Sequence, residues 1–113
     1  MHMDTTGLFP AAARYFVFAE YNRAKQIVQL FEPNAEVLDD GQLYSGHPEI
    51  MKWLTGPASE FTTISSRLGV ETTIDSTVIR VRIEGNFPGG CVDLRFQFVE
   101  SESGRIASLA ITA

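Results

Sequence analysis

The chain has 113 residues, the length of one domain, so we expect a single domain over residues 1–113. Hydrophobic residues make up 44% of the chain, which favours a folded protein with a core over a disordered one. The net charge of −5 argues against nucleic acid and anionic membranes as partners, because both bind clusters of Lys and Arg.

The few cysteines and histidines limit the chemistry that the chain can carry. Cys91 is the single cysteine, which excludes an internal disulfide, and two histidines far apart in the sequence predict no metal site. We expect no cofactor. Residues 1–10 lack the basic and apolar segments of a signal peptide, and no apolar run reaches the roughly 20 residues of a membrane-spanning helix. These features predict a cytoplasmic protein.

The first predicted helix covers residues 8–20. Pro10 falls in its first turn, where the missing N–H has no intrahelical partner to lose. Tyr15 lies in the middle of the helix, and Ala19 shares its face four residues later. Apolar residues cover most of the circumference, which predicts a helix buried on more than one side.

A second helix is predicted over residues 23–31, with Asn22 as its N-cap. The sequence Glu-Pro-Asn at 32–34 ends it, because a proline cannot continue the helical hydrogen-bond ladder. A short strand is expected over residues 35–39, followed by an Asp-Gly turn at 40–41.

The third predicted helix begins at Pro48, with His47 or Ser45 as its cap, and ends before a Gly-Pro pair. Its inward stripe includes Trp53, the single tryptophan, and Leu54.

The second half of the chain has the composition of β-strands. Residues 60–69 fit either a weak strand or a loop, and the segment 55–70 should shape the mouth of any pocket. Three runs rich in Val, Ile, Thr and Phe follow at 70–84, 91–100 and 105–112, separated by turn-forming clusters. Helices followed by an antiparallel meander predict an α+β fold.

Alternation along the strands assigns the two faces of the predicted sheet. One face collects the apolar side chains on which the helices should pack: Ile79, Val81, Ile83, Val92, Leu94, Phe96 and Phe98. The other face is charged and includes Arg80, Arg82, Asp93 and Arg95. This mixed-charge face is expected to be either solvated or in contact with another subunit.

The order of these segments resembles a known family. The stretch ARYFVFAEYNRAKQIVQLFEPNAEVLDDGQLYSGHPEIMKWL, followed by GNFPGGCVDLRFQF and GRIASLAIT, is similar to the SnoaL-like proteins of the nuclear transport factor 2-like superfamily. The resemblance covers nearly the whole chain and depends on the ordered series, since no single motif in it is specific.

The resemblance implies a conical fold in which three N-terminal helices pack on a curved antiparallel sheet around an apolar pocket. It also implies frequent homodimers through the outer face of the sheet. The superfamily contains ketosteroid isomerase, scytalone dehydratase and polyketide cyclases, and also many members without catalytic activity. The fold by itself therefore does not determine the function.

The resemblance to ketosteroid isomerase implies two catalytic residues. Asp39 in EVLDD matches the strand aspartate that moves a proton beside a carbonyl group, and Tyr15 in ARYF matches the tyrosine that holds the enolate oxygen. In an apolar cavity, a desolvated carboxylate is a stronger base, and a phenol donates one directed hydrogen bond where negative charge develops.

The third catalytic group of that enzyme, a protonated acid, has a weaker match. Asp93 in CVDLRF aligns with it by sequence, but alternation puts Asp93 on the face opposite Phe96 and Phe98. Alignment by face puts Leu94 there instead, which donates no hydrogen bond. A β-bulge after Asp93 would restore the acid to the inner face.

Simpler structural roles compete with each of these assignments. Asp39 can instead orient the turn by accepting backbone N–H bonds, and Tyr15 can be a buried phenol satisfied by one partner. Asp40 fits a solvated turn residue, and Asp93 fits an ion pair with a neighbouring arginine on the outer face.

We therefore expect a pocket for a small hydrophobic or carbonyl-bearing molecule and cofactor-free isomerase or lyase chemistry. The predicted lining comprises Ala19, Trp53, Leu54, Leu94, Phe96, Phe98 and Leu109. The alternatives are a non-catalytic ligand-binding or dimerisation module, and a protein-interaction subunit that uses the outer sheet face. The expected homodimer surface contains Arg80, Arg82, Asp93 and Arg95.

Overall fold

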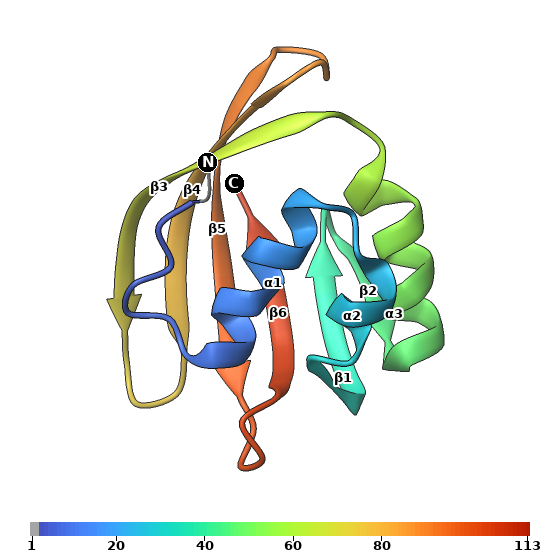
Figure 1. Cartoon of the computed structure of the whole chain (residues 1–113), viewed down its shortest axis with the longest axis vertical. Coiled ribbons are helices and arrows are strands. Elements are labelled where there is room, and N and C mark those ends of the chain that lie inside the picture. Colours follow the sequence, from blue (N-terminus) through green and yellow to red (C-terminus); the bar gives the residue numbers. More distant parts are fainter. Residues whose placement is uncertain (1–2) are drawn as a thin grey trace.

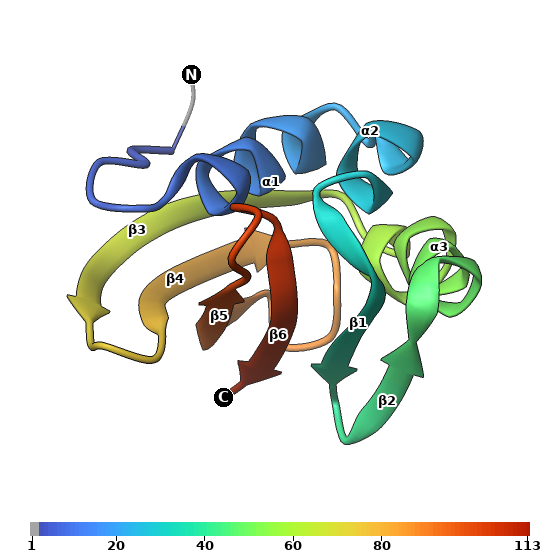
Figure 2. The same cartoon turned by 90° about the horizontal axis from the view of Figure 1, so that it is seen from below.

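A computed structural model describes residues 3–113 and shows a curved six-stranded sheet with helices on its concave side (Figures 1 and 2). The helices are α1 (Pro10–Glu20), α2 (Ala24–Val28), α3 (Gly46–Thr55) and the 3-10 helix η1 (Pro57–Ser59). The strands are β1 (Phe31–Asp39), β2 (Gln42–Ser45), β3 (Thr63–Thr72), β4 (Thr77–Gly85), β5 (Cys91–Glu100) and β6 (Ile106–Thr112).

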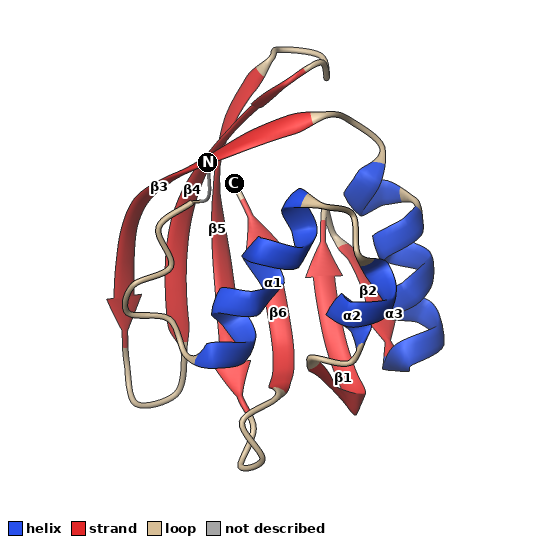
Figure 3. Cartoon of the chain, in the orientation of Figure 1, coloured by secondary structure: helices blue, strands red, loops and turns tan. Residues whose placement is uncertain are grey.

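The strand order is β2-β1-β6-β5-β4-β3, and all neighbours are antiparallel except β1 and β6, which run parallel. The helices precede most of the sheet in the chain and gather on one side of it, as Figure 3 shows. The α+β class predicted from the sequence is therefore confirmed. None of the described helices is both long enough and apolar enough to cross a membrane.

Helix α1 lies against the middle of the sheet because its inner face is made of alanines and two large rings. Ala11, Ala12, Tyr15 and Phe16 are all buried. The small alanines allow the helix to approach the strands, and Phe16 then makes an edge contact of 5.2 Å, between ring centroids, with Phe96. This packing fixes the height of Tyr15 above the sheet.

The turn between β1 and β2 sets the position of Asp39. Asp40 and Gly41 both have positive φ, 52° and 76°, which is the two-residue hairpin geometry that Asp-Gly favours. Asp39 is consequently the last residue of β1, opposite Gln42 of β2 and Ile111 of β6.

The predicted second helix is wrong at both ends. Asn22 has a φ of 52° and is not the cap, because Arg23 occupies the N-cap position without a side-chain hydrogen bond. The helix ends at Val28, and Phe31 already belongs to β1. Pro33 therefore lies within a strand, where an irregular register between β1 and β6 accommodates its missing donor.

The predicted run 70–84 is two strands joined by a turn. β3 ends at Thr72 and β4 begins at Thr77, and the apolar residue between them, Ile74, is 99% exposed. The ambiguous segment 60–69 supplies most of β3. Isoleucine is typical of β-strands, so its presence in the turn made residues 70–84 resemble one continuous strand.

Candidate functional site

A cavity of about 670 Å³ lies between α1, α3 and the concave face of the sheet, with η1, the start of β3 and the β4–β5 hairpin around its opening. Its lining is predominantly apolar and aromatic, as is usual for small-molecule sites. The lining residues are Met3, Tyr15, Phe16, Ala19, Glu20, Asn22, Asp39, Trp53, Pro57, Ala58, Ser59, Phe61, Thr62, Thr63, Ile64, Ser65, Ile83, Phe87, Pro88, Val92, Leu94, Phe96 and Ile111.

Asp39 and Tyr15, which lie on different elements, both line this cavity. Strand β1 presents the half-buried Asp39, and its Oδ2 accepts a hydrogen bond of 2.9 Å from the indole Nε1 of Trp53. Within residues 3–113, the Asp39 side chain accepts no other hydrogen bond. One carboxylate oxygen is thus oriented by the indole, and Oδ1 has no partner in the described chain.

Tyr15 is surrounded by aromatic rings and is 6% exposed. The ring of Trp53 is nearly parallel to it at 6.5 Å between centroids, and Phe98 meets it edge-on at 5.7 Å. Burial, and then the negative charge of Asp39, raise the pKa of the Tyr15 hydroxyl above its ordinary value. The phenol therefore stays protonated and able to donate at neutral pH.

The Tyr15 hydroxyl has no hydrogen-bond partner among the described residues. None of the fully buried side-chain oxygen or nitrogen atoms in the described chain lacks a partner, so this oxygen retains some exposed surface. Tyr15 lines both the large cavity and a small pocket of about 40 Å³ beside it. The phenol is therefore a candidate donor for a ligand oxygen.

The acid that would complete an isomerase-like site is not in the cavity. Asp93 lies on the outer face and accepts two hydrogen bonds from Arg82, 2.8 Å from Nε and 3.1 Å from Nη2. The β4–β5 register runs without a bulge from Thr77–Phe98 to Glu84–Cys91, so no irregularity turns Asp93 inward. Leu94 occupies the inner position instead.

The remaining predicted lining residues divide into three groups. Ala19, Trp53, Leu94 and Phe96 line the main cavity, and Leu54 lines a small neighbouring pocket of about 40 Å³. Phe98 and Leu109 do not reach the cavity: they are 0% and 1% exposed and form the core under α1. These two residues face inward as alternation predicts, but the helix covers them at the centre of the sheet.

The mouth of the cavity contains residues that the sequence did not single out. Phe61, before β3, and Phe87, in the β4–β5 hairpin, approach to 5.9 Å between ring centroids. The Thr62 N–H donates 3.0 Å to the Asn86 side-chain oxygen, which links the two segments. The sequence gives one indication of this contact: a single phenylalanine stands in each of two otherwise polar, turn-rich segments.

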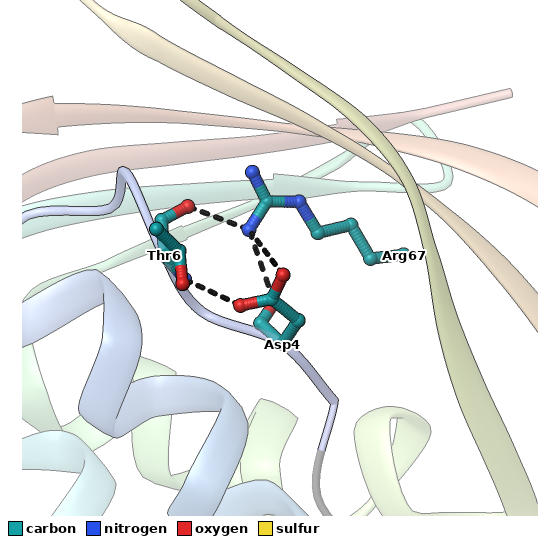
Figure 4. A network of polar contacts seen from close by, with 3 residues as sticks. All are labelled: Asp4, Thr6 and Arg67. Atoms are coloured by element: carbon teal, nitrogen blue, oxygen red, sulfur yellow. Dashed lines mark hydrogen bonds and ion pairs between the residues drawn. The ribbon is translucent and has the colours of Figure 1, made fainter.

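The N-terminal arm also borders the cavity, because Met3 lines it, and Figure 4 shows the polar contacts that hold the arm against Arg67. The guanidinium of Arg67 donates to the Thr6 carbonyl at 2.5 Å and pairs with the Asp4 carboxylate at 3.5 Å. The arm brings Met3 to the cavity wall, where its N–H donates 3.2 Å to Glu20. Arg67 thus holds one rim of the cavity in place.

Three other residues considered in the sequence analysis, His47, Asp40 and Cys91, lie outside the cavity lining. His47 lies inside α3 and is not its cap; its Nε2 is 2.8 Å from the Phe31 carbonyl. Asp40 is exposed in the turn, and Cys91 is exposed at the start of β5. Residues 3–113 contain no group of acidic, His or Cys side chains arranged to hold a metal ion, and His2 lies outside the described residues.

No protein-family profile and no curated protein matches this sequence. Solved structures do match. A Sinorhizobium meliloti protein, provisionally assigned as a polyketide cyclase, is 26% identical with a TM-score of 0.88 over 97% of this chain and 100% of its own.

Two more distant structures have the same architecture. SalBIII, an epoxide hydrolase/cyclase-like enzyme with a role in pyran ring formation in the polyether salinomycin, is 15% identical with a TM-score of 0.76, over 89% of this chain and 85% of its own. A protein from Sphaerobacter thermophilus is 17% identical with a TM-score of 0.78, over 93% of this chain and 94% of its own. The chain therefore has the α+β fold of the nuclear transport factor 2-like proteins.

Proposed function

We propose that this protein is a SnoaL-like, ketosteroid-isomerase-like catalyst of cofactor-free proton transfer on a small hydrophobic carbonyl compound. The observation that carries the proposal is the meeting of Asp39 and Tyr15 on one large apolar cavity, with the carboxylate oriented by Trp53. Formation of an enolate requires a base that removes the proton and a hydrogen-bond donor that stabilises the enolate oxygen.

In the proposed reaction, the Asp39 oxygen Oδ1 takes a proton from the carbon beside the carbonyl group. The C–H electron pair moves into the new C=C bond, and the carbonyl oxygen becomes an enolate oxygen. The Tyr15 hydroxyl donates a hydrogen bond to that oxygen. Return of the proton to another carbon completes an isomerisation, and loss of a leaving group completes a lyase reaction.

Two further features support the proposal. Trp53 holds one Asp39 oxygen, so the free oxygen has a defined direction, which reduces the entropic cost of reaching the substrate proton. Tyr15 is a neutral phenol at pH 7, and burial and the Asp39 charge, which raise its pKa above 10.0, disfavour its ionised form further. The polyketide cyclase assignment of one similar structure and the cyclase-like description of SalBIII are compatible with ring-forming or carbonyl substrates.

The test is proton exchange on 2-tetralone, a flat apolar ketone with acidic protons beside its carbonyl group. Proton NMR in D₂O measures their loss with and without the protein. We expect the protein to accelerate the exchange and Asp39→Asn to reduce that acceleration about 100-fold or more, because a general base typically contributes this much. Tyr15→Phe should reduce it by a similar factor through loss of the donor.

The matched control is Asp93→Asn, which removes an identical charge on the outer face. It should leave the exchange rate unchanged. An Asp39→Asn protein that folds normally and exchanges 2-tetralone at the wild-type rate would eliminate the catalytic proposal.

A non-catalytic ligand-binding module is the second candidate, and one observation favours it. The inner position that would hold a second donor beside Tyr15 is occupied by Leu94, so an enolate would have one donor in place of two. Under this alternative, 2-tetralone binds with the same affinity to wild type and Tyr15→Phe, and neither protein accelerates the exchange above the rate without protein.

We further propose a homodimer through the outer sheet face that carries Arg80, Arg82, Asp93 and Arg95. All four side chains are exposed, and the exposed Leu38 and Leu43 extend the same face at the other end of the sheet. Sedimentation equilibrium should give twice the chain mass, and Arg82→Glu should reduce the dimer. If the protein is a monomer at all concentrations, the homodimer proposal is wrong. The outer sheet face then does not bind a second copy of the chain.

A further inference from the structure

Among residues 3–113, the charged side chains that line the cavity are acidic. The described lining residues include two acids, Asp39 and Glu20, and none of them is Lys, Arg or His. The Asp39 side chain has one protein partner within residues 3–113, the neutral indole of Trp53. Within residues 3–113, no cation pairs with the Asp39 carboxylate, so an anionic ligand in the cavity would lie beside an unneutralised negative charge.

The negative charge of Asp39 also acts on Tyr15. Tyr15 is enclosed by aromatic rings, and the negative charge of Asp39 contributes to the raised pKa of its hydroxyl. Low-dielectric surroundings strengthen such charge interactions relative to water.

We propose that the cavity selects its ligand by charge: it accepts apolar molecules that bear no anionic group and rejects carboxylates and phosphates of the same shape through Asp39. This inference rests on the same site as the proposed function and names the class of substrate for it. The substrate is an uncharged or amine-bearing apolar molecule, and any acid is excluded until it has been esterified, amidated or decarboxylated.

Charge selection is compatible with the formation of an enolate in the same cavity. Proton transfer converts the Asp39 carboxylate into a neutral acid as the enolate gains its negative charge, so the total charge of the site is unchanged. The charge moves toward the Tyr15 donor, which is protonated and can hold it. An anionic substrate would instead add a second negative charge before the reaction begins.

Three probes of one shape separate charge from fit: 2-naphthoate, 2-naphthamide and 2-naphthamidinium, which carry a negative, a zero and a positive charge on the same planar frame. Isothermal titration calorimetry with the full chain at pH 7.5 gives their dissociation constants. We expect naphthamide to bind and naphthoate to bind at least about tenfold more weakly, because of repulsion by Asp39.

The Asp39→Asn variant tests whether the Asp39 charge causes the difference in affinity between the probes. Removal of the negative charge should tighten naphthoate binding and weaken naphthamidinium binding, so the ratio of these two dissociation constants is the readout. Asp93→Asn, which changes the net charge of the chain equally but lies on the outer face, should leave all three constants unchanged. A general effect of net charge predicts equal changes in the two variants, so the pair distinguishes the two causes.

Equal affinities for naphthoate and naphthamide would overturn the inference, and so would an Asp39→Asn variant that keeps the wild-type ratio. Failure of naphthamide to bind would overturn it as well, because the cavity would then not accept flat apolar molecules. The proposed function fails separately: it requires 2-tetralone exchange, which can be absent in a protein that shows the full charge selection.

Discussion

The indole N–H of Trp53 donates a hydrogen bond of 2.9 Å to the Asp39 carboxylate, which joins the last turn of α3 to the last residue of β1. Trp53 is 1% exposed, so its ring is held by packing and cannot easily move away. The bond gives Asp39 a fixed orientation at the cavity wall.

Trp53→Phe should lower the 2-tetralone exchange rate about tenfold. Phenylalanine retains most of the buried ring but removes the N–H, so Asp39 loses its orientation and the donor that stabilises its charged form. Proton NMR gives the rate, and calorimetry with 2-naphthamide is the control. A general collapse of the cavity would weaken naphthamide binding together with the rate, whereas loss of the Asp39 orientation would lower the rate alone.

Tyr15 should make the stability of the fold sensitive to alkaline pH. Its pKa is raised above the ordinary value of 10.0 by burial and by Asp39, so above pH 10 the unfolded chain releases a proton that the folded chain retains. The stabilisation is therefore complete below pH 10 and is lost as the pH rises further. Urea unfolding between pH 8 and pH 11 should show a smaller alkaline loss for Tyr15→Phe than for wild type.

The control for this measurement is Tyr21→Phe, which removes a hydroxyl from a side chain that is 56% exposed. Parallel pH profiles for wild type and Tyr15→Phe would mean that Tyr15 ionises as readily in the folded chain as in the unfolded one.

Phe98→Ala should destabilise the fold by about 3–5 kcal/mol, because the side chain is fully buried and its removal leaves a cavity in the core. Phe96→Ala should cost less, since that ring already borders the open cavity. Urea unfolding gives both values. Ligand binding provides the contrast: only Phe96→Ala should alter the affinity for naphthamide, and a larger effect from Phe98→Ala would contradict the assignment of Phe98 to the core.

Gly85→Ala should disturb the mouth of the cavity. A Cβ at this position would collide with the backbone carbonyl oxygen of Thr62, which cannot move without breaking the link between Thr62 and Asn86. We expect a loss of about 1–3 kcal/mol in the free energy of unfolding and faster hydrogen exchange at the Thr62 amide.

Gly69→Ala is the matched control for this change. Its Cβ would meet the guanidinium of Arg80, the far end of a flexible side chain that can move aside, so the cost should be small. Equal effects of the two substitutions on stability would show that the contact at Thr62 is not the cause.

The sequence alone determined the class of the fold and the faces of the sheet. Alternation of apolar and charged residues in 91–98 correctly separated Leu94 and Phe96 from Asp93 and Arg95, because the side chains of a strand must point to opposite sides. The Asp-Gly turn was also readable, since few residue pairs accept positive φ at both positions. Local chemistry specifies these features without help from the rest of the chain.

The tertiary structure decided which inward residues meet the cavity and which form the core. Phe96 and Phe98 are two residues apart on one face, yet only Phe96 reaches the cavity, because α1 covers the strand at Phe98. It also decided that Asp39 is held by the Trp53 indole and not by the backbone of its own turn. These outcomes depend on where a helix crosses the sheet, and that position is set by the packing of side chains distant in the sequence.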